Sequence, residues 1–142
     1  MPSRSSTSRV SRKAPLRPAP GAEPGLMALT LIEENGAVSI DRVAERFGMS
    51  KLQLAESIGL PRDALHRGLR AQAPKTQART LEMLEIVGRV VGWAGGEKQA
   101  MAWYRAEPIP AFGDRTAESL VKEGRAAAVR DWLDHVALGG FA

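Results

Sequence analysis

Apolar residues recur three or four positions apart along most of the chain, and this spacing predicts a succession of short α-helices. The pattern begins near residue 26 and continues almost to the C-terminus. Glycine or proline follows most of the apolar segments, and both residues end helices readily. We therefore expect an all-α fold with about seven helices and no β-sheet.

Three short helices are expected first. One spans Leu26 to Glu34. Ser39 and Ser50 begin the next two, because a serine side chain accepts hydrogen bonds from the free amides of the first turn. Gly48 and Gly59 end them. The residues expected on their buried faces are Ile40, Val43, Ala44, Phe47, Leu54, Ala55 and Ile58.

The segment from residue 54 to residue 65 has the spacing of a helix-turn-helix. The small Ala55 suits the point where two helices cross, Gly59 permits a left-handed turn, and Pro61 opens a second helix. A competing frame lies one element earlier, over residues 43–54. We prefer the later frame because its second helix and the loop after it have a local net charge of +4. The charged residues are Arg62, Arg67, Arg70, Lys75 and Arg79 against Asp63.

The later frame makes residues 26–75 a DNA-binding unit. Residues 61–67 should form the helix that enters the major groove, and a dimer would read two half-sites about one helical turn apart. A solvated basic face without a nucleic-acid partner is the alternative interpretation. The residues assigned to DNA are Lys51, Arg62, Asp63, His66, Arg67, Arg70 and Lys75.

A long helix is expected over residues 76–94, with Thr76 as its cap and Gly95-Gly96 as its end. Its apolar residues cover more than one face, and a stripe that wide indicates burial from two sides. The helix therefore connects the DNA-binding unit to the C-terminal unit, or packs in a dimer. The apolar residues are Leu81, Met83, Leu84, Ile86, Val87, Val90 and Val91.

Residues 95–142 predict further helices. One spans Glu97 to Arg105 and cannot extend through Pro108. A later helix has a strong apolar stripe, and the chain then finishes with two glycines, Phe141 and Ala142. A frayed end with Phe141 packed on its own core is one interpretation. The inward residues expected in these two helices are Ala100, Trp103, Tyr104, Val129, Trp132, Leu133 and Val136.

Several residues of this C-terminal part follow the order and spacing of a known family. They are Trp103, Pro108, Ala111-Phe112-Gly113, Thr116-Ala117-Glu118-Ser119-Leu120, Gly124, Val129, Leu133 and Gly140-Phe141-Ala142. From about Gly92 to the last residue, the chain resembles the toxin-binding domain of the Xre/MbcA/ParS antitoxins. With the Xre-like helix-turn-helix segment, the similarity covers residues 38–142. One departure is Ala117, where the family usually has proline, but alanine can still start a helix.

The resemblance implies an antitoxin of a bacterial type II toxin–antitoxin system. Its partner would be a RES-domain toxin that consumes NAD or transfers ADP-ribose, neutralised by direct binding, and the complex would repress its own operon. We also expect a homodimer and a larger hetero-oligomer with the toxin. The alternatives are a helix-turn-helix repressor whose C-terminal domain only dimerises, and a chromosome- or pole-associated adaptor.

On this interpretation, residues 95–142 bind the toxin. A cleft that admits a dinucleotide is concave and mostly apolar, and Gly139-Gly140 is thin enough to enter a narrow mouth. Phe141 would be an aromatic anchor, and the terminal carboxylate of Ala142 would meet an arginine. The surrounding interface is expected to be shaped by Trp103, Pro108, Phe112, Leu120 and Trp132, some of them only as core.

Residues 1–25 differ in composition from the rest. Serine, proline, glycine and arginine dominate, and no periodic apolar face exists, so we expect a disordered arm. The arm has a net charge of +4, equal to that of the whole chain, so residues 26–142 are balanced. The arm is either a non-specific phosphate contact or a solvated tail.

Composition restricts the remaining functions. The chain has no cysteine, which excludes disulfides and thiolate metal sites and suits a reducing cytoplasm. No apolar run approaches the ~20 residues that a transmembrane helix requires, and no apolar segment of a secretory signal follows the first basic residues. The two histidines make no zinc site without an HExxH motif, and Asp131 with His135 is interpreted as a surface pair. Residues 92–98 lack the preceding strand of a phosphate loop. We expect neither enzyme activity nor a cofactor.

Overall fold

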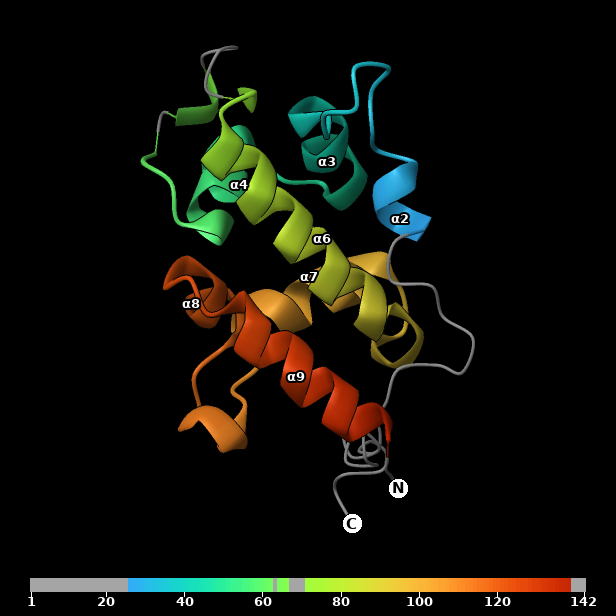
Figure 1. Ribbon diagram of the computed structural model, residues 1–142, viewed down its shortest axis with the longest axis vertical. Helices are drawn as coiled ribbons and strands as arrows, with labels where there is room; N and C mark the ends of the chain where they lie inside the picture. The colour runs from blue at the N-terminus through green and yellow to red at the C-terminus, as the bar shows by residue number, and fades with distance from the viewer. Residues whose placement is uncertain (1–25, 63, 67–70, 139–142) are drawn as a thin grey trace, which may run out of the picture.

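The backbone confirms the all-α expectation. The computed structural model describes residues 26–62, 64–66 and 71–138, and within them seven α-helices and two 3-10 helices form (Figure 1). The same residues contain no strand, although isolated bridges join Ile32 to Val38 and Ile109 to Arg115. In chain order the elements are α2 (Leu26–Leu29), α3 (Ile40–Phe47), α4 (Lys51–Ile58), η2 (Ala64–His66), α6 (Pro74–Ala94), α7 (Glu97–Ala106), η3 (Pro110–Phe112), α8 (Ala117–Lys122) and α9 (Ala126–Ala137).

Helices α3 and α4 begin and end where the serines and glycines predict. The Ser39 hydroxyl accepts a first-turn amide at 3.2 Å, and the Ser50 hydroxyl accepts the Gln53 amide at 3.0 Å. The Gln53 side chain accepts the Ser50 amide in return at 2.9 Å, which completes a capping box. Gly48 and Gly59 adopt left-handed φ values of 65° and 77°, which a residue with a Cβ rarely adopts.

The end of α2 differs from the prediction. The helix stops at Leu29 instead of Glu34. The Thr30 hydroxyl donates to the Met27 carbonyl at 2.7 Å, and the chain then turns toward the bridge between residues 32 and 38. A local side-chain bond and a pairing across the turn therefore replace the second half of the expected helix.

The start of α6 also differs. Pro74 is its first residue and Ala73 lies at the cap position, so the predicted cap at Thr76 was wrong. Thr76 is buried inside the helix, and its carbonyl accepts the Thr80 hydroxyl at 2.7 Å. Proline suits the first position because the amides of the first turn have no partner within the helix.

The other helices pack around α6. This helix contacts α2 and α4, which precede it in the chain, and α7, α8 and α9, which follow it. Figure 1 shows it running diagonally between these two groups. Burial from two sides, expected from the wide apolar stripe, is thus confirmed, and one continuous core results. The fully buried residues of α6 include Met83, Leu84, Ile86, Val87 and Val90.

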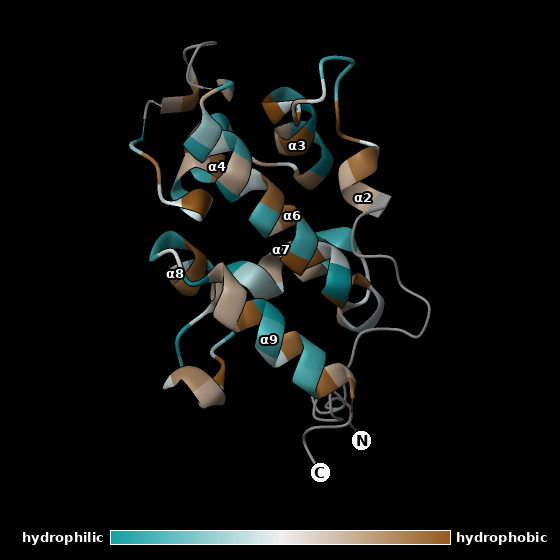
Figure 2. Cartoon of the chain, in the orientation of Figure 1, coloured by the Kyte–Doolittle hydropathy of each residue, from teal (hydrophilic) through white to brown (hydrophobic). Residues whose placement is uncertain are grey.

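The surface of the helices is mixed in polarity. Figure 2 shows hydrophilic residues interleaved with hydrophobic ones along α6 and α9. Within the described part of the chain, no helix is both long enough and apolar enough to cross a membrane. Large apolar side chains exposed on this part are Leu29, Leu81 and Leu138.

Candidate functional site

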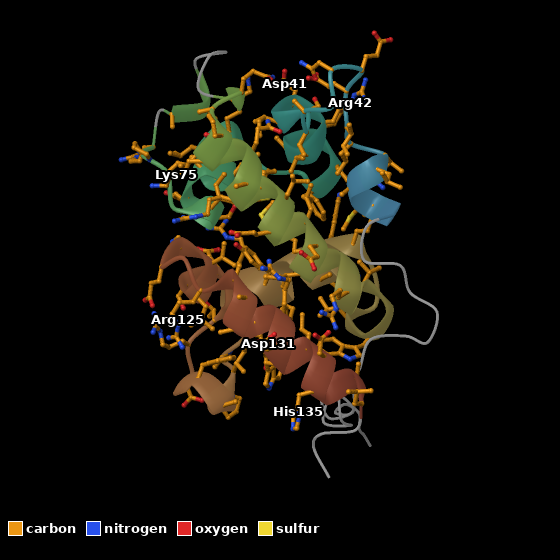
Figure 3. All side chains as sticks on the ribbon, viewed as in Figure 1. Asp41, Arg42, Lys75, Arg125, Asp131 and His135 are labelled. Carbon is orange, nitrogen blue, oxygen red and sulfur yellow. The ribbon has the colours of Figure 1, made fainter. Side chains whose placement is uncertain are left out.

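The residues predicted to contact DNA lie around α4, η2 and the start of α6. Lys51 is the first residue of α4, and its ammonium lies 2.9 Å from the carboxylate of Asp41. Arg62 and Lys75 are exposed, and Figure 3 shows Lys75 at the edge of the molecule. His66 is the last residue of η2. Three further predicted residues lie outside the described ones: Asp63, Arg67 and Arg70.

Arg79, counted above with the basic segment, is used inside the fold. Its guanidinium donates to the Ile58 carbonyl at 2.9 Å, and the Tyr104 hydroxyl of α7 donates to the Ser57 carbonyl at 2.8 Å. The carbonyls of Ala55 and Glu56, which precede them in α4, accept hydrogen bonds from the backbone amides of residues 60 and 59, respectively. All four carbonyls at the end of α4 therefore have donors, two of them supplied by side chains of α6 and α7.

Burial also affects the chemistry of Tyr104. The side chain is fully buried, and burial raises the pKa of its hydroxyl above the ordinary value of 10.0. The nearby carboxylate of Glu118 raises this pKa further. The hydroxyl therefore stays protonated, and remains a donor to α4, throughout the ordinary pH range.

The three tryptophans of the chain come together where α6, α7 and α9 converge. Trp93, in the last turn of α6, meets Trp103 of α7 edge to face, with ring centroids 5.7 Å apart. Trp103 stacks on Trp132 of α9 at 6.3 Å, with the ring planes 9° apart. All three side chains are half-buried, so each packs on the core and keeps part of its surface open. We name these three residues the tryptophan cluster.

Sequence reasoning missed Trp93. Its segment, with glycines at positions 92, 95 and 96, was interpreted only as a helix-breaking turn. A large aromatic residue two positions before a glycine pair was the available signal. The indole nitrogen of Trp93 is buried and has no hydrogen-bond acceptor among the described residues.

The other residues predicted to bind toxin have different surroundings. Phe112 ends η3 and is half-buried, with the Arg125 guanidinium 6.0 Å from its ring centroid. Pro108 is exposed between α7 and η3. Leu120 is fully buried in α8 and belongs to the core. The tail residues, Gly139 to Ala142, lie outside the described ones.

Helix α8 is fixed at its start and along one side. The Thr116 hydroxyl accepts the Ser119 amide at 3.0 Å, and Ala117 is the first helical residue, so alanine starts this helix. Glu118, nearly buried, accepts from the Arg105 guanidinium at 2.6 Å and lies 3.0 Å from the Lys122 ammonium. The pair of Arg105 with Glu118 attaches α8 to α7 beside the end of α4.

Two ion pairs align α9 with α6. The Arg89 guanidinium lies 2.6 Å from the Asp134 carboxylate, and that of Arg130 lies 3.6 Å from the Glu85 carboxylate. Figure 1 shows the C-terminal ends of α6 and α9 on the same side of the molecule. The last described residue, Leu138, is 88% exposed. The tail after residue 138 therefore starts at the end of the molecule that holds Trp93.

Arrangements typical of metal sites are not found in the described part of the chain. Asp131 and His135 are both exposed on α9, where Figure 3 labels them. Across residues 26–62, 64–66 and 71–138, no group of three histidine, cysteine, aspartate or glutamate side chains is placed to hold a metal ion.

The C-terminal part of the chain is similar to a known protein family. Residues 89–139 match the model of the family described as "Antitoxin Xre/MbcA/ParS C-terminal toxin-binding domain". Neither the curated proteins nor the solved structures give a match. The matched segment contains the tryptophan cluster, η3, α8 and α9. The C-terminal part of the chain is therefore similar to the toxin-binding domain of the Xre/MbcA/ParS antitoxins.

Proposed function

We propose that the chain is the antitoxin of a type II toxin–antitoxin system and neutralises a RES-domain toxin that consumes NAD or transfers ADP-ribose. The observation that carries this proposal is the match of residues 89–139 to the toxin-binding domain. In this proposal the chain acts in the cytoplasm by binding, and has no catalysis of its own. Residues 95–142 form its toxin-binding unit.

Open aromatic surface supports this assignment of the unit. Trp103 and Trp132 stack on each other and stay half-buried, and Phe112 and Pro108 are accessible on the loop that follows α7. Tryptophan is enriched among the residues that dominate binding energy at protein interfaces. Leu120 supports this surface from the core.

The tail supplies the inhibitory contact in this proposal. Gly139 and Gly140 enter the NAD cleft of the toxin, Phe141 is the aromatic anchor, and the carboxylate of Ala142 pairs with a basic side chain. Burial of one phenylalanine stabilises a complex by roughly 1.5–3 kcal/mol. That is too little for tight inhibition, so the helical surface must supply most of the affinity.

DNA binding by residues 26–75 completes the proposal, with the complex repressing its own operon. The packing of α4 supports the later helix-turn-helix frame. Helix α4 contacts α3, η2, α6 and α8, and its Leu54, Ala55 and Ile58 are fully buried. Its exposed side chains include Gln53 and Glu56, which give this face no net positive charge for contact with phosphates. We therefore assign α4 the supporting role and the segment from Pro61 onward the contacts to DNA, in a homodimer.

Co-purification tests the function. The tagged full-length chain is co-expressed with the protein encoded beside it, and the complex is isolated in high salt to exclude bridging by DNA. We expect the second protein to co-purify and to lose its NAD-consuming activity. A chain that purifies alone but binds its own promoter would be a repressor whose C-terminal domain only dimerises, and the proposal would be wrong.

A further inference from the structure

Among the residues that the structure describes, none accepts a hydrogen bond from the indole nitrogen of Trp93. It is the buried side-chain nitrogen or oxygen left unpaired within residues 26–62, 64–66 and 71–138. Buried polar groups are nearly always hydrogen-bonded, and an unpaired donor makes the free protein less stable. Trp93 itself is half-buried, and its helix ends directly after it at Gly95 and Gly96, whose φ values are 100° and 143°.

The surroundings of this donor are those of an interface. Trp93 is half-buried, and its ring packs edge to face against Trp103, which stacks on Trp132. Aromatic side chains that combine a packed ring with one polar atom suit protein interfaces, where the polar atom meets a partner. All three tryptophans lie within the segment that matches a toxin-binding domain.

The donor also lies close to the start of the tail. Arg89, one turn before Trp93 in α6, pairs with Asp134, one turn before Leu138 in α9. A toxin that receives residues 139–142 in its cleft must therefore lie against this end of the molecule. The tryptophan cluster is then part of the same interface.

We propose that Trp93 anchors the toxin, which supplies a main-chain carbonyl or carboxylate oxygen as acceptor for the Trp93 indole N–H. This inference rests on the proposed toxin binding and names a contact within it. Formation of the complex removes the unpaired donor, so part of the binding free energy comes from relief of a cost that the free chain carries.

The first experiment follows the indole N–H groups by NMR. The full-length chain is labelled with 15N-tryptophan, and its three indole resonances are assigned from single Trp→Phe variants. On addition of the neighbour-encoded toxin we expect the Trp93 indole proton to move downfield and its hydrogen exchange to slow. An indole resonance of Trp93 that saturating toxin leaves unchanged would overturn the inference.

The second experiment removes the donor and keeps the ring. Trp93 is replaced by 3-benzothienylalanine, in which sulfur takes the place of the indole N–H. We expect the free chain to keep or raise its Tm, because the unpaired donor is gone, and the Kd for toxin to rise about three- to tenfold. Trp93→Phe should weaken binding further because it also removes ring surface.

Two results would contradict the inference while leaving the proposed function intact. A lower Tm of the benzothienylalanine variant would mean that the donor is already paired in the free chain. A shift of the Trp93 resonance in the free chain after removal of residues 139–142 would identify the chain's own tail as the acceptor. Failure of the wild-type chain to bind its neighbour-encoded protein would instead refute the proposed function.

Discussion

Tyr104→Phe isolates the contact by which the C-terminal helices hold α4. The substitution keeps the buried ring and removes the hydroxyl that donates to the Ser57 carbonyl at 2.8 Å. That carbonyl is one of the four at the end of α4, and the other three keep their donors. The perturbation is therefore one buried acceptor left without a partner.

The expected cost follows from that geometry. A buried acceptor that loses its donor destabilises a protein by about 1–3 kcal/mol. For a fold of this size, 1 kcal/mol corresponds to about 4 °C in Tm, so we expect Tyr104→Phe to lower the Tm by about 4–12 °C. Arg62→Ala is the matched control, because an exposed side chain should change stability by less than about 0.5 kcal/mol.

The same variant has a distinct pH dependence. Burial raises the pKa of Tyr104 above 10.0 in the folded chain, whereas the unfolded chain has the ordinary value. The folded chain therefore keeps the Tyr104 proton at pH values where the unfolded chain has released it. The contribution of Tyr104 to the free energy of unfolding is fully present below pH 10, and above pH 10 it falls by about 1.4 kcal/mol per pH unit. Tyr104→Phe should remove this decline.

Calorimetry or chemical denaturation at pH 7, and at intervals above pH 9, measures both effects. A Tm within 1 °C of the wild-type value at pH 7 would refute the role of the hydroxyl at the end of α4. An identical loss of stability above pH 10 in wild type and variant would refute the pH argument. The first of these results would mean that α4 is held mainly by apolar packing of Leu54 and Ile58.

Two further predictions concern DNA. The double variant Arg62→Ala/Arg67→Ala should lose preference for the operator, measured by competition titration, by about 1–3 kcal/mol for each guanine contact removed, and unchanged operator binding would favour the earlier helix-turn-helix frame. Deletion of residues 1–25 removes a net charge of +4, so non-specific DNA affinity at low salt should fall while the Tm hardly changes. A large fall in Tm would contradict the prediction that this arm is disordered.

Local signals allowed the N-terminal helices to be predicted well. The hydroxyls of Ser39 and Ser50 accept hydrogen bonds from amides three residues ahead, and Gly48 and Gly59 adopt the left-handed conformation that ends a helix. Neighbours in sequence therefore determine both helices. Helix α2 was predicted too long because its end depends on the pairing of residue 32 with residue 38. Such a pairing leaves no trace in helical periodicity.

The candidate site was predicted only in part for a similar reason. Apolar spacing marks Trp103 and Trp132 as inward residues, and the family resemblance adds Leu120, but neither tells which of the three keep an open face. That depends on which helices converge, and only Leu120 became fully buried. Trp93 meets Trp103 because α7 packs against α6 after the turn at Gly95 and Gly96. Trp132 joins them from α9, which is aligned with α6 by ion pairs between residues 45 positions apart.

We propose that this chain neutralises a toxin by direct binding, with its tail in the NAD cleft of the toxin. The most direct measurement is NAD consumption by the purified neighbour-encoded toxin, titrated with the full-length chain and with a chain that ends at Leu138. We predict complete inhibition at stoichiometric full-length chain, and restored activity with the truncated chain, although the truncated chain still binds the toxin and keeps its Tm. Equal inhibition by the truncated chain would contradict the role of the tail, and undiminished NAD consumption with the full-length chain would contradict the account as a whole.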